Sequence, residues 1–164
     1  MFAWQFARML YTSDHLGLTR FVTMQNHYNL IYREEEREMV PLCRAEGVGL
    51  VPWSPLARGV LAGNRKSGTL RSEEDDYTKK LYTQEADDRV VDCVEQVAKD
   101  RGVPPAQVAL AWLLQRPGVT APIVGASKPH HLQDAVAALE IKLTRQEMEQ
   151  LEAVYVPHAI LGHH

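Results

Sequence analysis

The chain has 164 residues, 45% of them hydrophobic and 24% charged, and these values are typical of one globular domain with a buried core. Its formal net charge of −3 argues against a nucleic-acid-binding surface, and no apolar run approaches the roughly 20 residues that a membrane-spanning helix needs. The first residues lack the basic start and long apolar centre of a signal peptide. We therefore expect a cytoplasmic protein that binds neither nucleic acid nor membrane.

The first half of the chain alternates between helical and strand patterns. The spacing of apolar residues predicts, in chain order, a helix over residues 1–16, a strand over 21–25, a helix over 33–46 and a strand over 49–53. Gly17 and Gly47 mark the ends of the two helices. The acidic run Glu34–Glu36 lies in the first turn of the second helix, where it complements the helix dipole, and we expect it to form a solvated face.

The second half begins with a long polar stretch, residues 64–88, and connections of more than about 15 residues are usually functional loops or disordered. The elements predicted after it are a helix over residues 88–101, a helix from 105, a strand over 120–124, a helix over 130–139 and a helix from 145 to about 154. Pro105 suits a first helical turn, and Thr144 with Glu147 forms a capping box. Cys43 and Cys93 lie within helical patterns, which indicates reduced core residues and not a disulfide or metal site.

This order of elements predicts an α/β fold in which parallel strands are connected by crossover helices. Three strands are few, because a parallel sheet is normally covered on both faces and leaves no open edge. The sequence therefore resembles part of a larger architecture.

Three polar loops follow the predicted strands, at the carboxyl ends where α/β folds bind their ligands. They cover residues 25–28, 53–59 and 125–128. The second and third loops combine hydroxyl groups, a cation and backbone N–H groups, which together suit a phosphate. A plain turn, or a capped helix with a surface lysine, uses the same residue types, so each loop alone leaves both interpretations open. Three such loops together favour one extended phosphate-bearing ligand.

Other catalytic and metal-binding patterns are weak. The sequence has no Gly-x-Ser-x-Gly nucleophile elbow, no His-Glu-x-x-His motif and no P-loop. His130 and His131 are adjacent and are expected to point to different sides of a helix, which makes them a poor metal pair. For His163 and His164 at the end of the chain, a mobile end is favoured, and a metal pair or a tag remnant are the alternatives.

Three segments together identify a family: YNLIYREEERE (residues 28–38), VPWSPLARGVLAG (51–63) and PIVGASKPHHLQDAVAAL (122–139). At these spacings they resemble the carboxyl-terminal half of the aldo-keto reductases, in particular the branch with bacterial reductases and potassium-channel β-subunits. The likeness runs from residue 2 to about residue 158. That family is an eight-stranded (β/α)8 barrel that binds NADPH across its strand ends and transfers hydride to a carbonyl carbon. The resemblance implies that residues 1–164 form a partial (β/α)8 TIM barrel with about strands six to eight, and that the cofactor is NADP(H).

The resemblance also implies contacts at the reactive end of the cofactor. Gln25 resembles the glutamine that contacts the nicotinamide amide, and Trp53 resembles the aromatic residue against which the nicotinamide ring stacks. The loop that clasps the pyrophosphate corresponds to Ser54, Leu56, Arg58 and Gly59.

Further contacts are implied at the adenosine end. Gly125, Ser127 and Lys128 resemble the segment at the 2′-phosphate, which is consistent with NADP in preference to NAD. The remaining adenosine contacts correspond to Arg71 in the long loop, to His131 and to Asp134. Ala135 stands where many relatives have asparagine.

The catalytic Asp, Tyr, Lys and His of the family belong to earlier strands, so no catalytic role is carried onto this sequence. We expect a truncated gene product that is inactive alone and acts on a small carbonyl substrate only when complemented. An alternative is a non-catalytic NADP-binding or half-barrel module that associates with itself through open barrel edges. A third is a mostly unfolded chain, because half of the barrel core would be absent.

Overall fold

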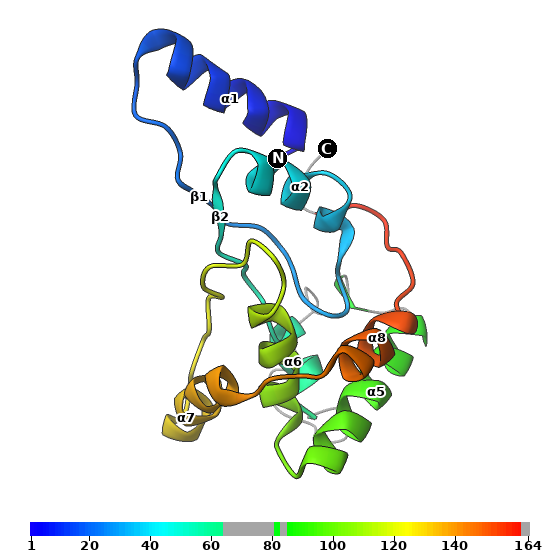
Figure 1. The fold of residues 1–164 in the computed structure, drawn as a ribbon. Helices are drawn as coiled ribbons and strands as arrows, with labels where there is room; N and C mark the ends of the chain where they lie inside the picture. Colours follow the sequence, from blue (N-terminus) through cyan, green and yellow to red (C-terminus); the bar gives the residue numbers. More distant parts are fainter. Residues whose placement is uncertain (64–80, 83–84, 162–164) are drawn as a thin grey trace.

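The computed structural model describes residues 1–63, 81–82 and 85–161 of the chain. Figure 1 shows α1 at one end of the molecule and α5 to α8 gathered at the other, with two short strands between them. The elements in chain order are α1 (Ala3–Leu16), β1 (Thr23–Met24), η1 (Glu34–Glu36), α2 (Met39–Ala45), β2 (Gly49–Leu50), η2 (Ala57–Ala62), α5 (Glu85–Arg101), α6 (Pro105–Leu114), α7 (Pro129–Ala137), η3 (Ala138–Glu140) and α8 (Arg145–Ala153).

The strands β1 and β2 are parallel, with Thr23 opposite Gly49 in the register. Two further parallel bridges join His27 to Trp53 and Leu50 to Val119, so the three predicted strand regions lie side by side. The described residues therefore form an α/β arrangement with few strands, consistent with part of a barrel.

The strand expected over residues 120–124 is not assigned as one. This segment lies beside β2, and its hydrogen bonds include those from Thr120 N to Leu50 O (2.8 Å) and from Ile123 N to Pro52 O (2.8 Å). Pro52 and Pro122 have no N–H group to donate, so the ladder between the two segments is interrupted. The expected pairing is present, but its regular hydrogen-bond pattern is not.

The acidic run of residues 34–36 does not form a solvated face, and this expectation was wrong. The Glu34 side chain is only 3% exposed and pairs with Arg37. It also accepts hydrogen bonds from Tyr155 Oη (2.6 Å) and His158 N (2.8 Å). Glu36 is bound by its own set of donors, from Tyr28, Arg33 and Arg116. In this 3-10 turn before α2, the Glu34 and Glu36 carboxylates are fixed both by neighbouring residues and by partners from distant parts of the chain.

Two hydrophobic clusters form the core. The larger one joins η2, α5, α6 and α8 around the fully buried Trp112, with Leu61, Val94 and Leu151 among its members. The smaller one contains Phe6 and Leu10 of α1 together with Cys43 and other residues of α2 and β2. Both cysteines are free thiols, as expected. In the described part of the chain, none of the helices combines the length and apolar character that a membrane crossing requires.

The predicted helix ends are largely confirmed. Gly17 ends α1 with φ 64°, a left-handed conformation that glycine adopts without steric cost. Thr144 and Glu147 form the predicted capping box of α8, and Pro105 opens α6. The first turn of α1 is also capped, because Gln5 Oε1 accepts a hydrogen bond from Phe2 N (2.9 Å).

Candidate functional site

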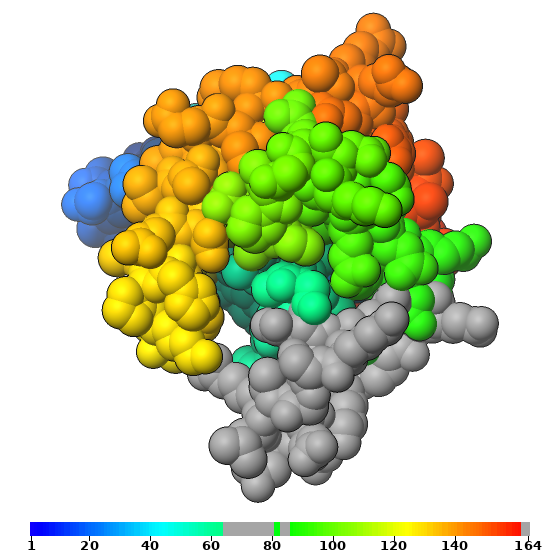
Figure 2. Space-filling model, turned by 90° about the horizontal axis from the view of Figure 1, so that it is seen from below, coloured from blue at the N-terminus to red at the C-terminus, as the bar shows by residue number. Residues whose placement is uncertain are grey.

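The three polar loops emerge at the same edge of the strands. The first and second loops are joined by a hydrogen bond from Trp53 N to Asn26 O (2.9 Å), and the third segment is joined to Pro52 through Ile123 N (2.8 Å). Figure 2 shows a hollow between the teal residues that follow β2 and the yellow residues that lead into α7. The carboxyl ends of the three strand regions therefore meet, as parallel strands require.

The second loop has an unusual backbone. Ser54, Ala57 and Arg58 have φ values of 56°, 48° and 57°, and Gly59 has φ 101°. A left-handed residue other than glycine costs about 1 kcal/mol, and clusters of such residues occur mainly at functional sites. Leu56 (φ −101°, ψ 17°) is followed by left-handed Ala57, and hydrogen bonds from Ala57 N to Ser54 O and from Gly59 N to Leu56 O, both at 2.9 Å, close the tight turns of this loop. The Arg58 side chain is exposed beside this turn.

Trp53 is half-buried and belongs to an aromatic stack. Its indole lies on the His27 ring, with centroids 4.2 Å apart and planes 13° apart. The other face of His27 stacks on Tyr32 at 4.3 Å and 11°. His27 is only 5% exposed, and its Nε2 lies 2.5 Å from Tyr82 Oη. Burial, assisted by the nearby charge of His158, lowers the pKa of His27 to about 4, so the imidazole is neutral at pH 7.

Asn29 joins the first loop to the second. Its Nδ2 donates to Ser54 O (2.9 Å) and to Tyr82 Oη (3.1 Å). Its Oδ1 accepts from the backbone N–H groups of Ile31 and Tyr32, both at 2.9 Å. Because the Asn29 side chain is completely buried, these bonds fix where the Trp53–Ser54 segment leaves β2.

Sequence reasoning assigned no role to Asn29 or Tyr82. Asn29 directly follows the residues of the first loop. A polar residue this close to a strand end was the sequence feature that could have pointed to its role. Tyr82 fell inside the long polar stretch, where no local pattern distinguishes it. Gln25 is exposed beyond the end of β1 and lies outside this buried cluster.

The third loop leads into α7. Gly125, Ser127 and Lys128 are exposed, and Lys128 is the residue that precedes the helix. Ser127 Oγ lies 3.4 Å from His131 Nδ1. Asp134 Oδ1 accepts a hydrogen bond from Gln107 Nε2 on α6 (2.8 Å), so one carboxylate oxygen fastens α7 to its neighbour. Arg71, the remaining site residue inferred from the sequence, lies outside the described residues.

His130 and His131 do not diverge as expected. Their ring centroids are 4.4 Å apart and their planes meet at 82°, an edge-to-face contact. In the first turn of a helix no preceding turn restricts the side-chain rotamers, which allows neighbouring rings to meet. Within the residues that the structure describes, no group of three His, Cys, Asp or Glu side chains is arranged to bind a metal ion.

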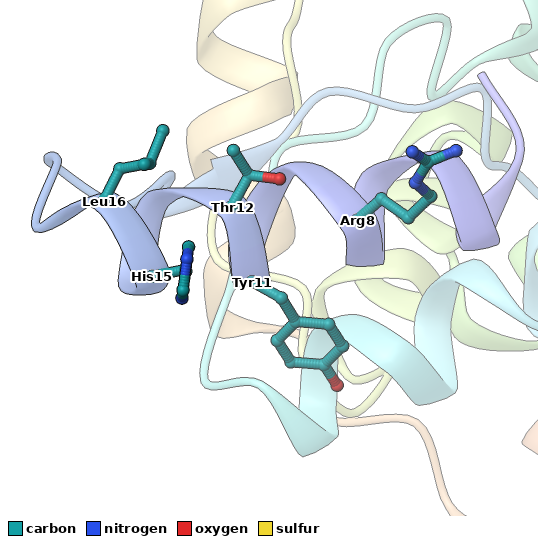
Figure 3. A pocket seen from close by; sticks show the side chains of 5 residues that line it. All are labelled: Arg8, Tyr11, Thr12, His15 and Leu16. Atoms are coloured by element: carbon teal, nitrogen blue, oxygen red, sulfur yellow. The ribbon is translucent and has the colours of Figure 1, made fainter.

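Two open hollows, of about 340 and 670 Å³, lie along α1 and not at the strand ends. Figure 3 shows the smaller one, with Tyr11 extending toward α2 and with Arg8, Thr12, His15 and Leu16 along the helix. Tyr11 Oη donates to Glu46 at 2.8 Å, which ties this helix to the end of α2. These hollows belong to the outer surface of α1 and are separate from the three loops.

Comparison with known proteins identifies the family. The model of the aldo/keto reductase family matches residues 3–156. An aldo-keto reductase of Metarhizium robertsii is 44% identical over 99% of this chain and 44% of its own length. A putative aryl-alcohol dehydrogenase of Schizosaccharomyces pombe is 43% identical over 99% of this chain and 46% of its own length. The versiconal hemiacetal acetate reductase of Aspergillus parasiticus is 43% identical over 98% of this chain and 48% of its own length. The chain thus spans about half the length of these relatives, and it belongs to the aldo/keto reductase family.

Proposed function

We propose that this chain is the cofactor-binding part of an NADP(H)-dependent aldo-keto reductase barrel, with about strands six to eight. The observation that supports this most directly is the meeting of the three strand-end loops, through the Trp53–Asn26 and Ile123–Pro52 hydrogen bonds. A dinucleotide cofactor has a planar ring at one end and phosphates along its length. Its site therefore needs an aromatic surface for the ring and cations or hydroxyl groups for the phosphates, all at one edge of a sheet.

The residues of the first two loops suit the nicotinamide and pyrophosphate. Trp53 stacks on His27 with one face and is half-buried, so its other face is the side available to a planar ring. The exposed Gln25 amide can bond the nicotinamide carboxamide. The exposed guanidinium of Arg58 suits the pyrophosphate charge, and Ser54, Leu56 and Gly59 complete that loop. When bound, the reduced nicotinamide supplies the hydride.

The third loop suits the 2′-phosphate. Lys128 precedes α7, whose first N–H groups and dipole favour an anion, and Ser127 adds a hydroxyl beside it. Gly125 leads the chain into this turn. We assign His131, Asp134 and Arg71 to the adenosine end, with Asp134 using the oxygen that does not accept from Gln107.

The proton donor of the reaction is proposed to come from another part of a complete barrel. Tyr28 Oη donates to Glu36 (2.6 Å), and burial followed by this hydrogen bond raises its pKa. Tyr32 Oη accepts from Leu161 N (3.0 Å). Both hydroxyls are engaged in structural hydrogen bonds, so neither suits proton transfer to a carbonyl oxygen. We expect carbonyl reduction only where the remaining barrel elements supply the acid.

Calorimetric titration of the full chain with NADPH and with NADH tests the proposal. We expect saturable binding that is tighter for NADPH, and we expect Lys128→Ala to weaken NADPH binding about tenfold while leaving NADH nearly unchanged. Trp53→Leu should weaken both cofactors by a similar factor. Arg145→Ala is the matched control, because its ion pair with Glu149 joins side chains that are 92% and 62% exposed. Equal affinity of the Lys128→Ala variant and the unmodified chain for NADPH would contradict the assignment.

A non-catalytic assembly module is a second candidate function, favoured by one surface. Among the described residues β1 pairs with β2 alone, and the neighbouring Phe21 and Val22 are 45% and 73% exposed. Trp4 on α1 is also 56% exposed. Open strand edges with apolar side chains promote association. Light scattering over a range of concentrations should then give a dimeric mass that Val22→Lys returns to a monomer, whereas a monomer at every concentration would exclude this candidate.

A further inference from the structure

The stack that begins at Trp53 continues to the carboxyl-terminal segment. Beyond His27 and Tyr32, the ring of Tyr32 meets His158 edge-on, with centroids 6.2 Å apart and an angle of 65°. His158 in turn stacks on Tyr155 at 5.7 Å and 27°. We call these five rings the aromatic column. The column connects the residue proposed to bear the nicotinamide with a segment more than a hundred positions later in the sequence.

The segment of residues 155–161 is fastened at several points. His158 Nε2 lies 2.8 Å from Asp87 Oδ1 at the start of α5, and the two side chains are only 4% and 7% exposed. His158 N donates to Glu34 Oε1 (2.8 Å), and Leu161 N donates to Tyr32 Oη (3.0 Å). Figure 1 shows this red segment leaving α8 and running along the side of the molecule toward α2. The hydrogen bonds of residues 155–161 therefore reach both Glu34 of η1 and Tyr32 of the aromatic column.

The two histidines of the column have opposite charge preferences. Hydrogen bonding to Asp87 raises the pKa of His158, and Glu34 adds to this effect against the cost of burial. Burial lowers the pKa of His27 to about 4. Tyr32 therefore lies between an imidazole that is kept neutral and one that is stabilised as a cation. A neutral His27 presents a flat, uncharged face to the Trp53 indole.

We propose that residues 155–161 form a strap that positions Trp53, with His158 as a positioning residue that acts through Tyr32 and His27. This inference deepens the proposed function, because it rests on Trp53 bearing the nicotinamide. The strap fixes Tyr32 from two sides, through the His158 ring and through Leu161 N. Tyr32 then supports His27, and His27 sets the plane of the indole. Without the strap, the far end of the column loses its support and the indole is free to tilt.

Ordinary packing of a chain terminus would also stabilise the protein, so the test needs a measurement specific to Trp53. Trp112 is completely buried and Trp4 is 56% exposed. In a Trp4→Phe background, acrylamide quenching of fluorescence therefore reports mainly on Trp53, and a Trp4→Phe/Trp53→Phe chain supplies the background signal. Each variant of the strap is measured in this background without any cofactor.

We expect His158→Leu to increase the acrylamide quenching constant of Trp53 about twofold, because the supported ring becomes locally mobile. Asp87→Asn should leave quenching close to that of the parent, since an amide oxygen can still accept from His158. Val97→Ala is the control for general destabilisation, because Val97 lies in the core on α5 and is only 2% exposed. The strap is refuted if His158→Leu gives the same quenching as the parent, or if Val97→Ala raises quenching as much as His158→Leu does.

Calorimetric titration with NADPH then separates this inference from the proposed function. We expect His158→Leu to weaken NADPH binding about fivefold through misorientation of Trp53, whereas Lys128→Ala weakens binding without changing quenching. If the parent chain binds no NADPH but His158→Leu still raises quenching, the coupling to Trp53 stands and the cofactor assignment fails. If NADPH binds and His158→Leu changes neither quenching nor affinity, the strap fails and the cofactor assignment stands.

Discussion

Acid should destabilise the protein through His27. This imidazole is buried, and its pKa falls from 6.5 in the unfolded chain to about 4 in the folded one. Above pH 6.5 both states are neutral at this residue, so it contributes no pH dependence. Between pH 6.5 and about 4 the unfolded chain binds a proton that the folded chain does not. The free energy of unfolding therefore falls across this interval and levels off below it.

The size of this effect follows from the width of the interval. The difference between 6.5 and about 4, at about 1.4 kcal/mol per pH unit, gives a loss of roughly 3 kcal/mol. Urea denaturation at pH 7, 6, 5 and 4 measures it, with His27→Phe as the comparison, because phenylalanine can stack between Trp53 and Tyr32 but does not titrate.

The pH dependence of stability that His158 contributes has the opposite sign, so the parent chain must be compared with the His27→Phe chain. Its folded pKa is raised, and the stability it contributes is complete below pH 6.5 and is lost as the pH rises through the folded pKa. Both chains retain His158, and the difference between their stability curves isolates His27. Curves that run parallel from pH 7 to pH 4 would refute the reasoning.

Three further predictions follow from the contacts. Glu34→Leu should lower the free energy of unfolding by about 3 kcal/mol, because it leaves the half-buried Tyr155 hydroxyl and the His158 N–H without their acceptor. Urea denaturation at pH 7 measures this loss, and a loss below about 1 kcal/mol would contradict the burial of the Glu34 carboxylate. Thr144→Ala should cost about 1 kcal/mol through loss of the capping box, against less than about 0.5 kcal/mol for the exposed Arg145→Ala, and equal losses would argue against the cap. His158→Gln should reduce stability more at pH 6 than at pH 9, and a uniform loss at both values would show that the Asp87 pair does not depend on the imidazole charge.

The helix boundaries could be predicted because their signals are local. Gly17 after α1 and the Thr144–Glu147 pair at α8 act within one turn of the backbone, and both have the expected geometry. The alternation of helices and strands likewise indicated parallel pairing, and the three strand-end loops do meet. The third strand was overestimated because the effect of Pro52 and Pro122 on the ladder depends on which segments become neighbours.

The buried polar residues could not be predicted, because their partners are distant in sequence. Glu34 looked like part of a solvated face, yet it accepts from residues 121 and 124 positions further along the chain. Asn29 and Tyr82 meet Ser54 only after the first two loops and the end of the long stretch have come together. Local composition records the polarity of such residues and not the position of their partners.

Nuclear magnetic resonance of the tryptophan indole N–H groups tests the cofactor site most directly. The sequence has three tryptophans, so the spectrum should contain three indole signals, and Trp53→Phe identifies the one from the second loop. We expect NADPH to shift the Trp53 signal saturably, with little change at Trp4 on the outer face of α1 or at the buried Trp112, and we expect NADH to require a higher concentration. A Trp53 signal that does not move at saturating NADPH, or that moves no more than the Trp4 signal, would contradict a nicotinamide site on this loop.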